Sequence, residues 1–220
     1  MRNFLILVML FMPLPLLAEP TAFDNTLTSV YILIRTIGVL MGAILAFMGI
    51  KKLVDYAQDQ RNPKNSPISA IVIFFAAGLL LNLNQTMSMV INTVQGNVGD
   101  SYCFYAETTR DNPFGNNTSC FNDAMQLTEE LAQKLKNENG AEESVQKLKE
   151  KLRLLFTLFQ VIGVIYFIKA IYMLKEASEG SQQTGYGKII LMIFASALVI
   201  DMPHTIDMLI NTIQSWNETV

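Results

Sequence analysis

Long apolar blocks separated by short polar segments dominate this chain of 220 residues. Beyond the N-terminal region, four blocks lie at about 31–50, 68–90, 154–174 and 189–209. Each approaches the roughly 20 residues that an α-helix needs to cross the hydrocarbon core of a bilayer. A backbone in lipid must satisfy its own hydrogen bonds, so such blocks favour helices. We therefore predict an all-α membrane protein with four transmembrane helices.

The first 18 residues, "MRNFLILVMLFMPLPLLA", combine one arginine, an apolar stretch and a final Ala18. This order is typical of a secretory signal peptide. Pro13 and Pro15 would also interrupt a spanning helix at this point. An uncleaved first span is the alternative interpretation. We interpret 1–18 as a signal peptide, so that the mature chain begins outside the cytoplasm of a bacterium.

Charge sets the predicted orientation of the spans. Basic loops stay on the cytoplasmic side of a membrane. The polar segment after the first block contains four basic residues, Lys51, Lys52, Arg61 and Lys64. We therefore predict a first transmembrane hairpin over 19–95 and a second over 154–220, both with cytoplasmic tips. Both mature termini and the connecting insert, 96–153, then lie in the periplasm beside a bacterial inner membrane.

The insert contains the two cysteines of the chain, Cys103 and Cys120. A cysteine pair in an oxidising compartment predicts a disulfide bond. From Asn122 onward the insert is amphipathic and charged, which predicts two helices, the second continuing into the third span. We therefore predict a periplasmic insert that combines a disulfide-bonded loop with amphipathic helices.

One phrase occurs in both halves of the chain, as "MVINTVQ" at 89–95 and "MLINTIQ" at 208–214. Ile37-Gly38-Val39 likewise matches Ile162-Gly163-Val164. A shift of six residues across the shorter second loop then aligns the returning helices and places Asn82, Gln85 and Ser88 on Asp201, His204 and Asp207. Chance matching of apolar segments is the alternative. We interpret the pattern as a parallel repeat of two helical hairpins.

Small residues recur four positions apart on the first span, at Gly38, Gly42 and Ala46. Such a stripe lets a second helix approach closely. Gly163, with Ala170, makes a weaker version on the third span. These residues predict a helix-packing face, and the partner helix belongs either to the same chain or to another subunit.

Five ionisable or histidine side chains lie within the predicted spans: Arg35, Lys169, Asp201, His204 and Asp207. The last three share one side of the fourth span, where Pro203 is expected to kink the helix. We interpret them as a polar outer mouth, since a metal site would need further ligands. Arg35 is placed to pair with Asp201 or with Asp207, and Lys169 to reach the inner headgroups.

Neither catalysis nor nucleic-acid binding is indicated. The chain has one histidine, no glycine-rich phosphate loop and no nucleophile beside a base. Its net charge of −3 and the lack of a basic patch argue against a nucleic-acid binder. We predict a protein that is not an enzyme, needs no cofactor or metal, and has the lipid bilayer as its first partner.

The segment "GVIYFIKAIYMLKEASEGSQQTGYGKIILMIFASALVIDMPHTIDML", 163–209, resembles the IcmC (DotE) inner-membrane proteins of type IVB secretion systems and their counterparts in IncI plasmid conjugation. The similarity lies in Tyr172-Met173-Leu174-Lys175, the Ser/Gln/Gly loop and the apolar helix that ends near Asp201. The resemblance implies a structural subunit of a secretion or conjugation channel, assembled as an oligomer with other secretion subunits.

Two other functions stay open. The first is a stand-alone ion channel or transporter, which is disfavoured as long as the predicted helices run unbroken through the bilayer midplane. The second is a regulatory membrane protein such as an immunity or exclusion factor.

Overall fold

The computed structural model describes residues 20–58, 66–95, 142–180 and 185–218. These residues form six helices and no strand: α2 (Pro20–Gln58), α3 (Pro67–Leu81), α4 (Leu83–Gln95), α6 (Glu142–Ser178), α7 (Tyr186–Ile200) and α8 (Met202–Glu218). The predicted all-α class is therefore confirmed for the described part of the chain. The predicted signal peptide, both cysteines, Arg61 and Lys64 lie outside the described residues.

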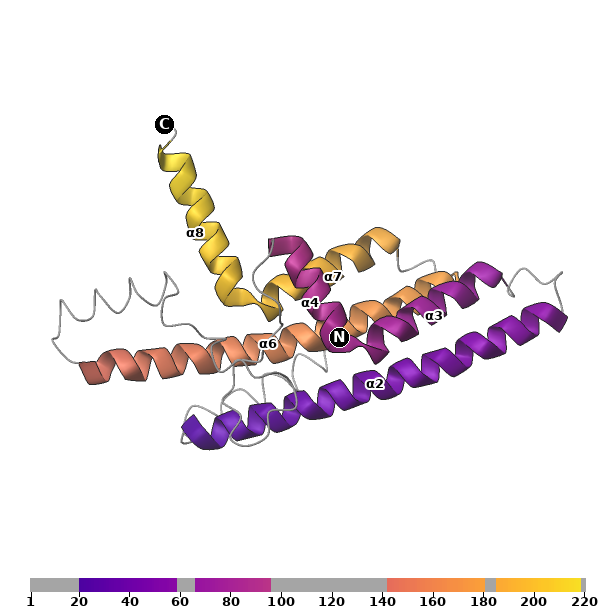
Figure 1. The fold of residues 1–220 in the computed structure, drawn as a ribbon, viewed down its shortest axis with the longest axis horizontal. Helices are drawn as coiled ribbons and strands as arrows, with labels where there is room; N and C mark the ends of the chain where they lie inside the picture. Colours follow the sequence, from indigo (N-terminus) through magenta and orange to yellow (C-terminus); the bar gives the residue numbers. More distant parts are fainter. Residues whose placement is uncertain (1–19, 59–65, 96–141, 181–184, 219–220) are drawn as a thin grey trace.

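Four helices, α2, α3, α6 and α7, run along the long axis of the molecule (Figure 1). Helix α3 packs on both α2 and α6, and α7 packs on the other side of α6. Helices α2 and α6 are much longer than the helices that pair with them, at 39 and 37 residues. The long helices therefore form the frame on which the shorter, returning helices are placed.

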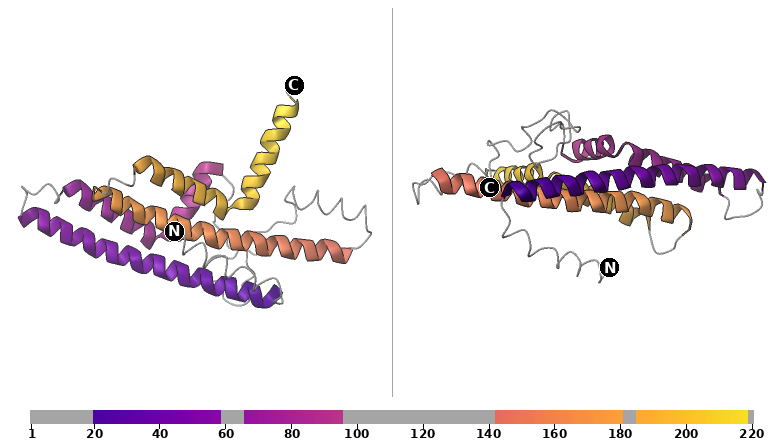
Figure 2. Two further views of the ribbon diagram at one scale, coloured as in Figure 1. Left: turned by 180° about the vertical axis from the view of Figure 1, so that it is seen from behind. Right: turned by 90° about the horizontal axis from the view of Figure 1, so that it is seen from below.

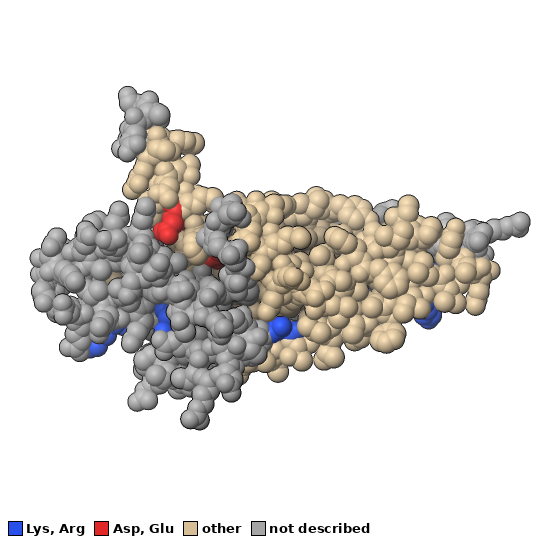
Figure 3. Space-filling view, in the orientation of Figure 1, with Lys and Arg blue, Asp and Glu red and all other residues tan. Residues whose placement is uncertain are grey.

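The bundle is apolar both inside and outside. Its interior contains fully buried aliphatic and aromatic side chains, among them Leu45, Ile73, Leu80, Val164, Phe167 and Ile171. Large apolar side chains are also exposed along the outer faces of α2, α3 and α7. Among the described residues in Figure 3, most of one such face is uncharged, with basic side chains along its lower edge and acidic surface near the base of α8. An apolar exterior around an apolar core is suited to lipid and not to water.

Both returning helices are sharply bent. Helices α3 and α4 meet at 95° on either side of Asn82, and α7 and α8 meet at 94° on either side of Asp201. With 15 residues each, α3 and α7 are about 22 Å long, less than the thickness of a hydrocarbon core of about 30 Å. The expectation of an unbroken helix over 68–90 is therefore wrong, whereas the bend at Asp201 lies beside Pro203, where a kink of the fourth span was expected.

The number of spans follows from these bends. Two unbroken segments, Thr26–Gln58 and Lys151–Ser178, are long and apolar enough to cross a membrane. Up to four spans are present if each bent pair is one broken span.

The two helices after the bends have different surroundings. Helix α4 turns back across the bundle and packs against α7. Helix α8 touches its neighbours only near its base and then projects away from the bundle, as Figure 1 and the left view of Figure 2 show. From Asn211 to Trp216 every side chain of α8 is exposed. The molecule is therefore a packed helical body with one protruding arm.

Candidate functional site: the paired helix breaks

The helix breaks at Asn82 and Asp201 have the same backbone geometry. Asn82 adopts φ −107° and ψ 44°, and its N–H still donates to the Gly78 carbonyl at 3.2 Å. Asp201 adopts φ −115° and ψ 55°, and its N–H donates to the Ala197 carbonyl at 3.2 Å. Each residue thus completes the last turn of one helix while its own backbone turns the chain into the next.

One threonine supports each break. The Thr86 hydroxyl lies 2.9 Å from the Leu79 carbonyl oxygen and 3.0 Å from that of Asn82. The Thr205 hydroxyl lies 3.0 Å and 2.9 Å from the carbonyl oxygens of Leu198 and Asp201. Carbonyl groups in the last turn of a helix lack an N–H partner from their own helix. A threonine one turn beyond each break supplies that partner from its side chain.

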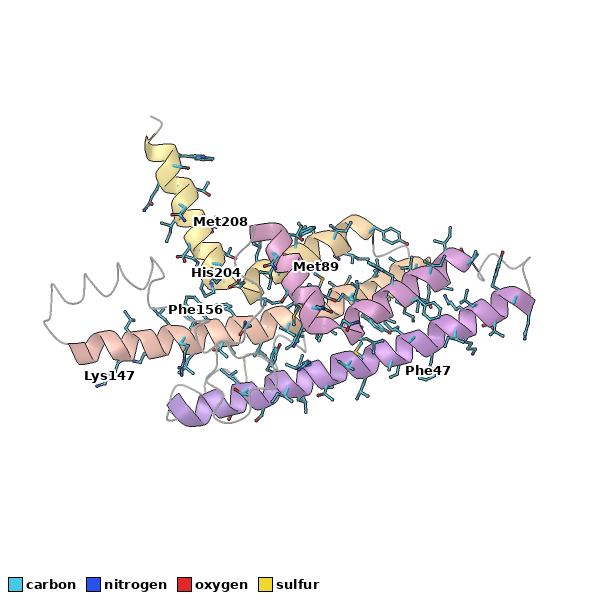
Figure 4. The ribbon with its side chains drawn as sticks, viewed as in Figure 1. Phe47, Met89, Lys147, Phe156, His204 and Met208 are labelled. Atoms are coloured by element: carbon cyan, nitrogen blue, oxygen red, sulfur yellow. The ribbon has the colours of Figure 1, made fainter. Side chains whose placement is uncertain are left out.

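The repeated phrase after each break is helical and also uses a threonine. Thr93 donates to the Met89 carbonyl and Thr212 to the Met208 carbonyl, both at 2.7 Å. Figure 4 shows Met89 on α4 and Met208 on α8, the two helices that follow the bends. The matching words in the sequence thus lie on the two helices that follow the bends, one packed on the body and one in the protruding arm.

Charge distinguishes the second break from the first. His204 Nδ1 lies 2.7 Å from Asp201 Oδ1, with both side chains on the turn that starts α8. Asp207 lies one turn further along α8. Together with Asp201 and His204 it does not form a group that could hold a metal ion, and no other three or more His, Cys, Asp or Glu side chains among the described residues do so. Pairing of Arg35 with Asp201 or Asp207 stays a prediction.

The first break is uncharged and contains one unusual amide. Its polar side chains are those of Asn82, Gln85 and Ser88, with Asn84 between them. The Asn84 Oδ1 atom is buried and has no hydrogen-bond partner among the described atoms. Leaving such an oxygen unsatisfied costs about 1–3 kcal/mol. The two breaks therefore share a backbone design but offer different polar groups.

Glycines bring each long helix against the returning helix just before the break. A Cβ atom on Gly42 would lie 3.0 Å from the Leu81 nitrogen and 3.2 Å from the Ala77 oxygen. A Cβ atom on Gly163 would lie 3.0 Å from the Ile200 nitrogen and 3.2 Å from the Ser196 oxygen. These are matching backbone atoms relative to the two breaks. Gly42 and Gly163 therefore make the same kind of contact relative to the two breaks.

The sequence matches Gly38, one turn before Gly42, with Gly163, and this equivalence stays a prediction. Gly38 instead faces α6 and α4, where an added Cβ would lie 3.0 Å from Ile168 Cδ1 and 3.4 Å from Leu83 Cδ2. Ala46 on the same stripe is half-buried. The stripe on α2 thus contacts helices of the same chain.

A polar cluster joins three helices at the other end of the bundle, the end predicted to be cytoplasmic. Lys52 Nζ on α2 lies 3.0 Å from a Glu179 carboxylate oxygen and donates to the Ser69 hydroxyl of α3 at 3.0 Å. Lys175 Nζ of α6 lies 3.1 Å from the other Glu179 oxygen. The Ser69 hydroxyl lies 3.4 Å from that of Ser178. We call Lys52, Ser69, Lys175, Ser178 and Glu179 the inner cluster.

The inner cluster shifts the protonation of its carboxylate. Partial burial raises the pKa of Glu179, but hydrogen bonds and positive charge from Lys52 and Lys175 outweigh it, so that the pKa lies below its ordinary value. Lys51, at the position of α2 just before Lys52, is exposed and does not belong to the inner cluster. Lys169 is also exposed and lies 5.9 Å from the centre of the Tyr166 ring.

Comparison with protein families, with curated proteins and with solved structures finds no match to this chain. The interpretation of function therefore depends on the resemblance of 163–209 and on the geometry described above.

Proposed function

We propose that this chain is a non-enzymatic structural subunit of a bacterial inner-membrane channel for secretion or conjugation, of the type IVB kind. The observation that supports it most is the arm formed by α8, which is detached from the body beyond its first turns. A helix that packs on nothing contributes little stability to a single chain, because helices in proteins are stabilised mainly by packing of one face against the rest of the protein. A subunit of a larger assembly gives such an arm a role.

The side chains of the arm fit this role. Leu209, Ile213 and Trp216 follow one another at spacings of four and three residues, so they share one face of α8, and all three are exposed. Asn211 and Gln214 lie on other faces of the helix. Exposed apolar stripes of this kind mark contacts with membranes or with other proteins. The arm is therefore the first surface to test for contacts with other subunits.

The proposed subunit consists of two copies of one ancestral hairpin. The matched breaks, their threonines and the contacts of Gly42 and Gly163 support this duplication, since they concern specific atoms and not merely apolar composition. Both hairpins enter the bilayer from the periplasmic side in this proposal, so that their tips lie in the cytoplasm. The signal peptide is removed, Cys103 and Cys120 form a disulfide bond, and the insert and termini lie in the periplasm.

Purification from the native bacterium in mild detergent tests the proposal, combined with an assay of protein secretion or plasmid transfer. We expect the full chain to co-purify with other envelope proteins of the transfer machine, and deletion of the chain to abolish transfer. A variant ending at Ile200, which lacks the arm, is expected to lose the partners while it remains in the membrane. Transfer at the wild-type rate after deletion would refute the proposal.

Ion or solute passage is a second candidate, and the bends favour it. Transporter sites are commonly built where a membrane helix is interrupted and its backbone groups face a substrate. The argument that unbroken helices disfavour this function is removed by the breaks at Asn82 and Asp201. The buried Asn84 oxygen and the Asp201 carboxylate are suitable cation ligands. Flux through the purified chain in liposomes, abolished by Asp201→Asn, would establish this function in place of the first.

A further inference from the structure

Contacts between the two halves of the chain are one-sided. Helix α3 of the first half packs on α6, and α4 packs on α7. A pair of hairpins related by a two-fold axis would also pack α7 on α2 and α8 on α3. Among the described helices, neither of these reciprocal pairs is packed together. Helices α3 and α4 of the first half thus pack on the second half, whereas the corresponding helices α7 and α8 do not pack on the first half in the same way.

Equivalent residues show which surface is left open on the second half. Leu83, Met87 and Ile91 form one face of α4, and each is at most 5% exposed. The alignment of Asn82 with Asp201 makes Met202, Ile206 and Ile210 their equivalents on α8. All three are only half-buried. The face that α4 buries against the body is therefore incompletely covered on α8.

The complementary surface is open on the first half. Val161, Ile168 and Ile171 of α6 are at most 7% exposed. The alignment of Gly42 with Gly163 makes Leu40, Phe47 and Ile50 their equivalents on α2, and these are 58%, 74% and 51% exposed. Figure 4 shows Phe47 on the outer side of α2. Lipid covers apolar surface of any kind, so exposure alone identifies no protein partner. The partner is indicated by the difference in burial between equivalent positions of α6 and α2.

We propose that copies of this chain associate head to tail, with α7 and α8 of one copy packed on α2 and α3 of the next copy. This contact between chains has the same arrangement as the contact that α3 and α4 make with α6 and α7 within one chain. The two surfaces differ, so the association is heterologous and generates a ring when the rotation closes. The inference rests on the proposed role as a structural subunit and specifies how such a subunit assembles.

A specific pair of residues follows from the template. Within the chain, Ser69 on α3 and Ser178 on α6 approach to 3.4 Å between their hydroxyl oxygens. Their equivalents in the proposed interface are Lys188 on α7 and Ala57 on α2. Both of these residues are exposed. Lys188 of one copy is therefore expected to lie beside Ala57 of the next copy.

Cysteine crosslinking tests this pair in membranes of a host that has no secretion or conjugation machine. The double variant Lys188→Cys/Ala57→Cys is expected to give dimers, trimers and larger species after oxidation or treatment with a short bismaleimide. Co-expressed single variants with different tags are expected to give mixed dimers only. Each single variant alone is expected to stay monomeric, because a heterologous contact does not place equivalent residues together. The wild-type chain, with its own cysteines, is the blank.

The matched control is Ser69→Cys/Ser178→Cys, which is expected to close within one chain and shows that the bundle has folded. Only monomer from Lys188→Cys/Ala57→Cys, in membranes where the control closes, would overturn the proposal. Dimers from either single variant, or crosslinks only to host proteins, would overturn it as well. The proposed function is tested separately. Chains that give crosslinked dimers, trimers and larger species but bind no envelope partner in the native bacterium would keep the proposed interface and refute the proposed function.

Discussion

Gly163→Ala tests how closely α6 and α7 must approach before the second break. The added methyl group would lie 2.7 Å from Ile200 Cγ1 and 3.0 Å from the Ile200 backbone nitrogen. The backbone atom has no rotamer with which to move away, so the two helices must separate by several tenths of an ångström. Overpacking of this kind costs about 1–3 kcal/mol. In a chain of this size that corresponds to a decrease in Tm of about 2–12 °C.

Gly78→Ala is the matched control, because an added Cβ there has no atom within 4 Å and its equivalent in the second half is Ala197. Alanine is favoured over glycine inside a helix by about 0.5–1 kcal/mol, so this variant is expected to be as stable as the wild type or slightly more stable. Stability is measured in detergent by thermal unfolding followed with far-ultraviolet circular dichroism. Equal midpoints for Gly163→Ala and Gly78→Ala would refute the close approach.

Three further predictions concern the breaks, the inner cluster and the topology. Thr86→Val and Thr205→Val are each expected to lower the free energy of unfolding by about 1 kcal/mol, because a carbonyl loses its donor; unchanged unfolding curves would count against this. Ionised Glu179 is expected to contribute up to about 1 kcal/mol to the free energy of unfolding of the wild type. This contribution is fully present at higher pH and is lost as pH falls through the lowered pKa of Glu179, below 4.5. Glu179→Gln removes this part of the pH dependence, and an identical dependence in that variant would contradict the prediction. A membrane-impermeant thiol reagent is expected to reach Cys103 in reduced spheroplasts but not the introduced thiol of Arg61→Cys. The reverse labelling pattern would show that the topology is inverted.

Hydropathy was sufficient to predict the helical class because it depends only on the number and order of apolar residues. It could not show that α3 stops at Leu81, since Leu83 is apolar too and the break has no proline. Pro203 predicted the second break, and the first could be found only through its likeness to the second, in which Asn82 corresponds to Asp201. The threonine that replaces a lost backbone donor at each break is visible only once both helices are in place.

Long-range contacts were harder still to predict. The small residues of α2 indicated a packing face, but any of several helices fits a glycine stripe, and the match of Gly38 with Gly163 followed sequence words and not contacts. The inner cluster was missed for the same reason. In the sequence, Lys52 is one of several basic residues in a predicted cytoplasmic loop, and nothing near it identifies Glu179 as its partner. Such pairs depend on how two hairpins lie beside each other, which local pattern does not determine.

The depth of the single tryptophan, Trp216, tests the bent helix most directly. Met202 and Trp216 begin and nearly end α8, about 21 Å apart along its axis. Quenching by lipids brominated at defined depths is compared in proteoliposomes between the wild type and Met202→Trp/Trp216→Phe. With α7 along the membrane normal, the 94° bend predicts nearly equal depths for the two tryptophans. Depths that differ by about 20 Å would show that α8 continues α7 straight through the bilayer and would contradict the account.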